Sequence, residues 1–201
     1  NLVLVVLEAG RPAAEAGMGP PGAVPDGSSI FQVASLSKWV TAAGVLALAD
    51  RGLIGLDDPV EEHLTRWRFP ETGYDSRGVT IRRLLSHTGG LTDGLGYNGF
   101  ETAEAVQSLE ASLNEAVDAM EGANGRVEIG REPGSRFAYS GGGYTVLQMM
   151  VEDVTEQTFA GAMHDLVFSP SGMLSSTFDA DDASGSLVPI FDEDGERVPH
   201  R

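Results

Sequence analysis

The sequence predicts a mixed α+β fold, because strand patterns lie at both ends of the chain and helical patterns lie between them. Leu2–Leu7 is an apolar run of strand length and fits a buried strand. Residues 186–199 have the pattern of a hairpin with Asp194-Gly195 at its turn. In the middle of the chain, apolar residues recur at three- and four-residue steps, as they do on one face of a helix.

The composition is that of a globular chain with few basic residues. Its 201 residues suit one domain or two small ones, and 41% hydrophobic residues provide enough apolar material for a core. The 30 acidic and 13 basic residues give a net charge of −17, which argues against nucleic acid and anionic membrane surfaces as partners. The chain has no cysteine, so disulfides, thiol nucleophiles and cysteine-based zinc sites are excluded.

The apolar start of the chain, Asn1–Leu7, lacks the basic region of a signal peptide and is too short to span a membrane. The compartment therefore stays open, with the cytoplasm slightly favoured over secretion.

A long apolar pattern begins at Ser35 and runs to about Asp50. Leu36, Trp39 and Leu46 belong to it, and little polar face remains, so we expect a helix that is buried on most sides. The other helices that the spacing predicts cover residues 81–86 (capped by Thr80), 102–120, 142–153 and 158–167.

The start of that first helix carries a Ser-x-x-Lys motif, Ser35-Leu36-Ser37-Lys38. Residues i and i+3 share a helix face, so the Lys38 amine can reach the Ser35 hydroxyl and act as the base that a serine nucleophile needs. The backbone N–H of Ser35, at the helix start, can stabilise a developing oxyanion. A capping serine with a solvated lysine gives the same string by chance, but the apolar helix leaves a lysine few solvated places and favours catalysis.

A second candidate motif, Tyr139-Ser140-Gly141, follows Pro133-Gly134 and precedes an expected helix. A tyrosine beside a lysine-activated serine can carry a proton between the nucleophile and the leaving group. A tyrosine packed in a turn is the alternative, and this motif alone does not decide between them.

Four ordered blocks resemble the serine β-lactamase and penicillin-binding-protein superfamily. The similarity is to its class C β-lactamase-like group, which includes family VIII carboxylesterases and D-alanyl carboxypeptidases, and it extends from about Leu2 to Phe178. The blocks are Phe31–Lys38, Leu53–Val60, Ile81–Leu91, and Pro133-Gly134 leading to Tyr139-Ser140. By this resemblance, Ser35 is the nucleophile of a covalent acyl-enzyme, Lys38 is the general base and Tyr139 is the proton shuttle.

The resemblance implies a β-lactamase-like fold, with an antiparallel sheet flanked by helices plus a helical domain. We expect one incomplete unit, in which residues 1–58 form a sheet and helix region with the Ser-x-x-Lys helix. Residues 59–165 form a mainly helical region with the Tyr-Ser-Gly loop, and residues 166–201 return toward the sheet with a hairpin. The family's late Lys-Thr-Gly or His-x-Gly strand does not follow Tyr139. The C-terminal part of the sheet domain is thus expected to be missing from this chain, and a second polypeptide is one way to supply it.

Gly141 departs from the Tyr-x-Asn pattern of the group's lactamases and peptidases, whose asparagine binds the substrate amide. Esterase-like members often lack it as well. We therefore expect Ser140 and Gly141 to lie in the substrate-binding part of the site and the substrate to be a small ester. A β-lactam or a D-alanyl or D-amino peptide is the alternative. A binding homologue without turnover is a second alternative, which the joint presence of Ser35, Lys38 and Tyr139 speaks against.

Other candidate sites are weaker. His87 suggests a Ser–His–Asp triad, but the resemblance makes this histidine structural. His63, His164 and His200 have no partner at metal-ligand spacing, so no metal is expected, and no cofactor either. Gly141-Gly142-Gly143 lacks the Lys-Ser/Thr of a phosphate-binding loop.

Overall fold

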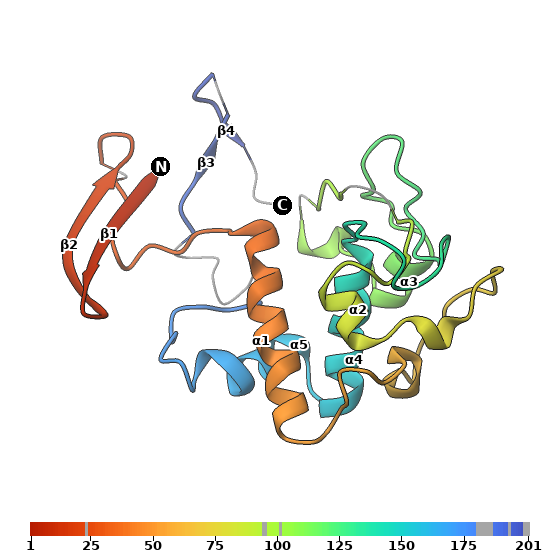
Figure 1. The fold of residues 1–201 in the computed structure, drawn as a ribbon. Helices are drawn as coiled ribbons and strands as arrows, with labels where there is room; N and C mark the ends of the chain where they lie inside the picture. Colours follow the sequence, from red (N-terminus) through yellow and green to blue (C-terminus); the bar gives the residue numbers. More distant parts are fainter. Residues whose placement is uncertain (23, 94–95, 101, 180–186, 193, 199–201) are drawn as a thin grey trace.

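The computed structural model describes residues 1–201 except 23, 94–95, 101, 180–186, 193 and 199–201. A helical body holds most of the chain, and a hairpin formed by the N-terminal residues stands beside it (Figure 1). This hairpin pairs β1 (Leu2–Glu8) antiparallel with β2 (Arg11–Met18). Near the C-terminus, β3 (Ile190–Phe191) and β4 (Arg197–Val198) form a second antiparallel pair. The predicted strands at both ends of the chain are therefore present.

The helical body is built on α1 (Ser37–Asp50) and α4 (Gly142–Thr155), which contact each other. Three short helices also pack against α4: α2 (Ile81–Leu85), α3 (Leu109–Asn114) and α5 (Phe159–Met163). A π-helical turn, η5 (His164–Phe168), continues α5. The 3-10 turns are η1 (Ala34–Leu36), η2 (Val60–His63), η3 (Ser76–Gly78) and η4 (Ala103–Ala105).

Side-chain caps fix the starts of the short helices. The Thr80 hydroxyl accepts a hydrogen bond from the backbone N–H of Arg83, as the sequence predicted for the start of α2. Ser108 and Thr158 cap α3 and α5 in the same way. Each cap pairs an N–H that the helix itself leaves unsatisfied.

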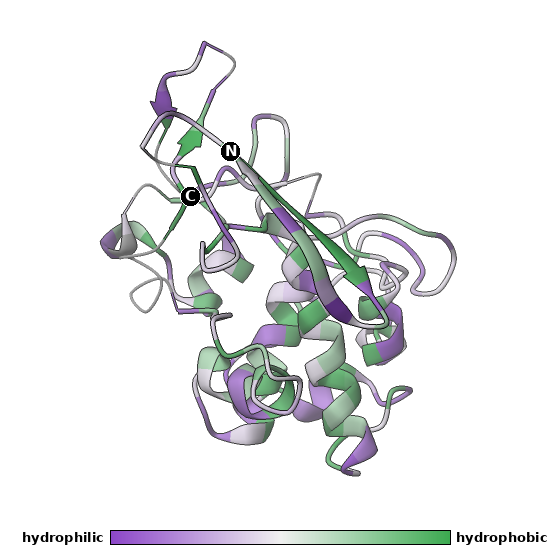
Figure 2. Cartoon of the chain, turned by 90° about the vertical axis from the view of Figure 1, so that its left-hand side faces the viewer, coloured by the Kyte–Doolittle hydropathy of each residue, from purple (hydrophilic) through white to green (hydrophobic). Residues whose placement is uncertain are grey.

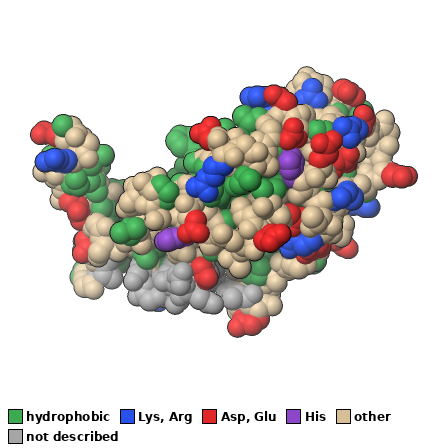
Figure 3. Space-filling view, turned by 90° about the horizontal axis from the view of Figure 1, so that it is seen from below, with side chains coloured by type: hydrophobic (Ala, Val, Ile, Leu, Met, Phe, Trp, Pro, Cys, Tyr) green, Lys and Arg blue, Asp and Glu red, His purple; other side chains and the backbone are tan. Residues whose placement is uncertain are grey.

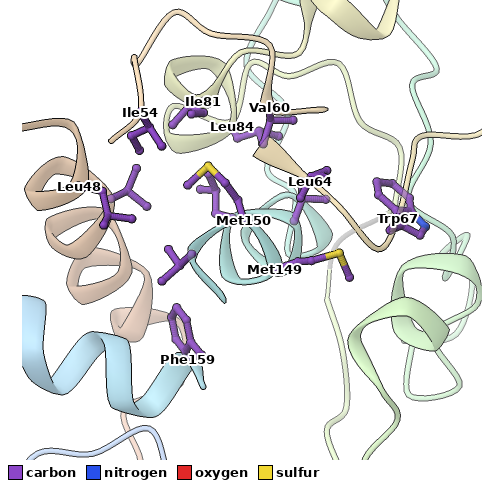
Figure 4. Packing of buried hydrophobic residues seen from close by; sticks show 14 of the residues in the cluster. Leu48, Ile54, Val60, Leu64, Trp67, Ile81, Leu84, Met149, Met150 and Phe159 are labelled. Atoms are coloured by element: carbon purple, nitrogen blue, oxygen red, sulfur yellow. The ribbon is translucent and has the colours of Figure 1, made fainter. Parts of the chain in front are cut away.

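The hydrophobic core lies between α1, α2 and α4. Figure 4 shows Leu48 of α1, Leu84 of α2 and Met150 of α4 pointing into one cluster, and each side chain is 2% exposed or less. Burial of such a side chain contributes roughly 1.5–3 kcal/mol to folding. This cluster fixes α1 against α4, the two helices whose starts carry the predicted site.

The expectation that the first helix is buried on most sides is wrong. Leu36, Trp39 and Leu46 are 62%, 80% and 46% exposed, because no described residue covers this face of α1. The apolar strand β1 (green in Figure 2) was expected to be buried and is also largely exposed. The hairpin projects away from the helical body, as the view from below shows (Figure 3), so its faces meet no core. Periodicity identified these elements but could not say what covers them.

The expected helix over residues 102–120 is also wrong, because only the turn η4 and the helix α3 form there. Gln107 supplies partners that would otherwise come from helical hydrogen bonds: its side chain accepts from the Val117 N–H and donates to the Glu115 carbonyl. Beyond that point, residues 116–120 pair with the loop at residues 96–99, including a bridge between Tyr97 and Ala119.

Acidic and basic side chains are spread over the surface of the helical body (Figure 3). Within the described residues, no helix is long and apolar enough to cross a membrane.

Candidate active site

Ser35 and Lys38 meet where the chain enters α1. Ser35 lies in η1 and Lys38 in the first turn of α1, and the Lys38 Nζ donates a hydrogen bond to the Ser35 Oγ at 3.1 Å. The three-residue offset produces this contact, as the sequence predicted. Ala34, just before the serine, has a φ of 44°, which non-glycine residues rarely adopt. This sharp turn of the backbone presents Ser35 at an exposed position.

Tyr139 reaches the same oxygen from a position 104 residues further along the chain. Its hydroxyl donates to the Ser35 Oγ at 3.0 Å. Burial opposes ionisation of this phenol, but hydrogen bonding to Lys38 and Ser35 and the positive charge of Lys38 outweigh it, so the pKa of Tyr139 lies below its ordinary value. The serine oxygen is therefore hydrogen-bonded by an amine and by a phenol whose pKa is lowered.

Two tyrosine rings flank Lys38. Its Nζ lies 5.2 Å from the centre of the Tyr139 ring and 5.6 Å from that of Tyr144. The Tyr144 hydroxyl donates to the Leu85 carbonyl at 3.1 Å, which fixes that ring. These contacts limit the positions that the flexible lysine side chain can take.

A cleft of about 770 Å³ opens over the serine. Ser35, Lys38, His87 and Tyr139 line its polar part. Apolar side chains, among them Trp39 and Leu46 of α1, line much of the rest, so the cleft can take a substrate with both a polar reacting group and a hydrocarbon part.

His87 supports Tyr139 from behind. The centres of their rings lie 4.4 Å apart, and the His87 Nδ1 accepts from the backbone N–H of Ser140 at 3.3 Å. Burial first, and then the charge of Lys38, lower the pKa of His87, while Asp93 acts in the opposite direction. The hydrogen bonds of the described residues do not join His87 to Ser35, in agreement with a structural role for this histidine.

Asp93 anchors the loop that carries Tyr139. The carboxylate is 1% exposed, and it accepts from the Ser140 hydroxyl at 2.5 Å, the Gly142 N–H at 2.8 Å and the Tyr97 hydroxyl at 2.8 Å. Ser140 is buried, and its oxygen also accepts from the Gly143 N–H. The side chain of Ser140 thus holds the loop together, and its predicted contact with substrate remains a prediction.

Gly141 lines a second cavity, of about 430 Å³, which Lys38 also lines. Ser37 and Thr41 of α1 also line it, as do Tyr97 and other residues of the 97–118 segment. Gly141 therefore lines a cavity, and its role in substrate binding remains a prediction. Among the described residues, no group of three or more histidine or acidic side chains is placed to hold a metal ion.

The beta-lactamase family model matches residues 1–186 of this sequence. The chain belongs to the beta-lactamase family. The chain is 36% identical over 148 residues to penicillin-binding protein 4* of Bacillus subtilis. This alignment covers 73% of the chain and 30% of the relative. The chain is also 31% identical over 200 residues to esterase EstB of Burkholderia gladioli, with 96% and 47% covered.

The fold of this beta-lactamase family chain is similar to that of an octameric penicillin-binding protein homologue from Pyrococcus abyssi. The TM-score is 0.74 at 24% identity, and the match covers 98% of the chain and 45% of the homologue. The predicted β-lactamase-like fold is therefore confirmed. The chain spans less than half the length of each of these relatives.

The predicted convergence of Ser35, Lys38 and Tyr139 is confirmed, since both other side chains bond to the Ser35 Oγ. Sequence patterns did not identify Asp93 and Tyr97. Both stand in a glycine-rich loop segment, and no local spacing connects them to the Tyr-Ser-Gly motif more than 40 residues later. Their only sequence signal is that Asp93 follows the Thr-Gly-Gly-Leu block that carries part of the family resemblance.

Proposed function

We propose that the complete protein hydrolyses small carboxylic esters through a covalent acyl-enzyme on Ser35. The observation that carries this proposal is the convergence of Lys38 Nζ and Tyr139 Oη on the Ser35 Oγ, at 3.1 and 3.0 Å. A hydroxyl with both a base and a proton donor in reach has what acyl transfer requires. The relation to an esterase at 31% identity supports the ester as substrate.

In the acylation step, Lys38 acts as the base: its amine takes the Ser35 proton while the Oγ attacks the ester carbonyl carbon. The carbonyl π electrons move to its oxygen, and the backbone N–H of Ser35 donates to this oxyanion. As the oxyanion collapses, the bond to the alcohol oxygen breaks and Tyr139 gives that oxygen its proton. Tyr139 regains a proton from the Lys38 ammonium, and a lowered pKa of Tyr139 makes its proton easier to release.

Deacylation reverses these roles. A water molecule gives a proton to Tyr139 or Lys38 and adds to the acyl carbon, and the Ser35 oxygen leaves and regains its proton. The step ends with the free acid and the original serine.

The preference for esters over amides rests on Gly141. Where relatives have an asparagine that binds a substrate amide, glycine offers no side chain, so an amide N–H would lose a partner at a cost of about 1–3 kcal/mol. An ester has no N–H to satisfy. The chain is also 36% identical to a penicillin-binding protein, so turnover of a β-lactam or a D-alanyl peptide is the alternative activity that the test must distinguish from ester hydrolysis.

We infer that, in the complete protein, additional β-strands pack against the exposed apolar face of α1. These strands belong to the same polypeptide or to a second one. The exposure of Leu36, Trp39 and Leu46 around the serine supports such a cover.

The test compares kcat/KM for short-chain p-nitrophenyl esters with kcat/KM for a chromogenic cephalosporin. We expect the ester value to be higher, Ser35→Ala to abolish ester turnover and Lys38→Ala to remove nearly all of it. Ser135→Ala, at an exposed serine near the Tyr139 loop, is the matched control and should keep the activity. A higher cephalosporin value would overturn the ester assignment, and ester turnover by Ser35→Ala would overturn the nucleophile.

A further inference from the structure

Gly141 has no room for a side chain, and the group that excludes one is Tyr97. A Cβ built at Gly141 would lie 2.9 Å from the Tyr97 Cδ2 and would overlap its Cε2, and the three nearest atoms all belong to this ring. The backbone of Gly141 has φ −72° and ψ −45°, which any residue adopts. Packing against Tyr97 therefore requires the glycine, and the conformation does not.

The Tyr97 ring is held in place by the network that also holds the Tyr139 loop. Its hydroxyl donates to the Asp93 Oδ2 at 2.8 Å, and the same oxygen accepts from the Gly142 N–H. On the backbone, Tyr97 forms a bridge to Ala119. Burial first, and then Asp93, raise the pKa of Tyr97, so the phenol stays protonated and keeps donating. The ring and Gly141 are thus fixed relative to each other.

The ring lines the second cavity, and Lys38 lines both this cavity and the cleft over Ser35. Phe100, Val106 and Leu109 line the same cavity of about 430 Å³, together with polar side chains that include Gln107, Asp118 and Gln148. An asparagine at position 141 would offer a donor and an acceptor there. A tyrosine ring whose hydroxyl is already bound to Asp93 offers only carbon atoms, so this wall favours hydrocarbon over an amide group.

We propose that Tyr97 is the specificity-determining residue of this site, because its ring takes the volume of a residue-141 side chain and walls a subsite for the hydrocarbon part of an ester. This inference rests on the proposed ester hydrolysis and deepens it. At the place where relatives have an asparagine side chain, this protein has the fixed aromatic ring of Tyr97.

The steric part is tested without turnover, by thermal unfolding of the complete protein. We expect Gly141→Asn to lower the Tm strongly in the wild-type background and to lower it by less than half as much in a Tyr97→Ala background. Gly130→Asn is the matched control, because a Cβ there overlaps Thr92 Cγ2 and its three nearest atoms all belong to Thr92, which Tyr97→Ala leaves in place. Equal Tm losses for Gly141→Asn in both backgrounds would overturn the steric relation.

The specificity part is tested by kcat/KM across p-nitrophenyl esters of increasing chain length. We expect Tyr97→Ala to raise the ratio of kcat/KM for long-chain esters to kcat/KM for short-chain esters by about tenfold or more. Tyr97→Phe keeps the ring and should retain the wild-type chain-length preference. The Tyr97→Ala/Gly141→Asn double variant should move the cephalosporin-to-ester ratio upward. Tyr74→Ala, at an exposed tyrosine that does not line this cavity, should leave all values unchanged.

The two proposals fail in different ways. Wild-type protein that hydrolyses no ester overturns the proposed function, whatever the unfolding data show. Wild-type protein that hydrolyses esters, with Tyr97→Ala leaving the chain-length preference unchanged, overturns the role of Tyr97 alone.

Discussion

Asp93 offers the sharpest structural prediction, because one buried carboxylate accepts three hydrogen bonds that fix the Tyr139 loop. Asp93→Asn keeps the shape but turns one oxygen into an NH₂ group, which cannot accept. At least one of the three donors then loses its partner, and the remaining bonds lose the charge of the acceptor. A bond to a charged group contributes roughly 1.5–3 kcal/mol. We therefore expect Asp93→Asn to reduce the free energy of unfolding by about 2–4 kcal/mol, a large share of the roughly 5–15 kcal/mol typical of a domain.

Urea unfolding of the complete protein measures this loss, with kcat on the preferred ester measured beside it. Asp153→Asn is the matched control, because that carboxylate also accepts three hydrogen bonds, two from Thr65 and one from Arg66. Both variants should be destabilised, but only Asp93→Asn should lower kcat, since only its loop carries Tyr139. A loss below about 0.5 kcal/mol for Asp93→Asn, together with an unchanged kcat, would refute the anchoring role.

Further predictions concern Tyr139, His87 and the two tryptophans. Tyr139→Phe should lower kcat by about 10²–10⁴-fold, the range of general acid–base catalysis, and an unchanged kcat would exclude it as the shuttle. Burial and Lys38 hold the pKa of His87 below 6.5, so the unfolded chain binds the extra proton first and stability should fall as the pH drops through 6.5. His87→Asn should remove this part of the pH dependence in unfolding experiments. In the 201-residue chain, Trp39→Ser should change stability by less than about 0.5 kcal/mol because the side chain is 80% exposed, whereas Trp67→Ser, at 6%, should cost about 3–5 kcal/mol. Equal losses would contradict the described exposure.

Local spacing predicted what depends on local contacts. The approach of Lys38 to Ser35 follows from a three-residue offset, and the start of α2 follows from the Thr80 cap. The same kind of pattern failed over residues 102–120. There, the side chain of Gln107 and the loop at residues 96–99 supply partners for backbone groups that a helix would have paired.

The remaining parts of the site depend on contacts between distant segments. Asp93 bonds to Ser140, which lies 47 residues further along the chain. The Tyr97 ring packs against Gly141, and no periodic pattern in the sequence connects these two residues. Only the fold brings these residues together, so the sequence could name Gly141 as a departure from a family pattern without showing what fills its place. Likewise, the apolar pattern of α1 could not show that Trp39 would be left exposed.

The formation of an acyl-enzyme on Ser35 is the central claim, and intact-mass analysis of the complete protein with a slowly hydrolysed ester tests it most directly. We predict a mass increase equal to one acyl group, located on the peptide that contains Ser35, formed slowly in Lys38→Ala and absent in Ser35→Ala. Acylation of the wild-type protein at another residue, or ester hydrolysis that persists without any adduct in Ser35→Ala, would contradict the account.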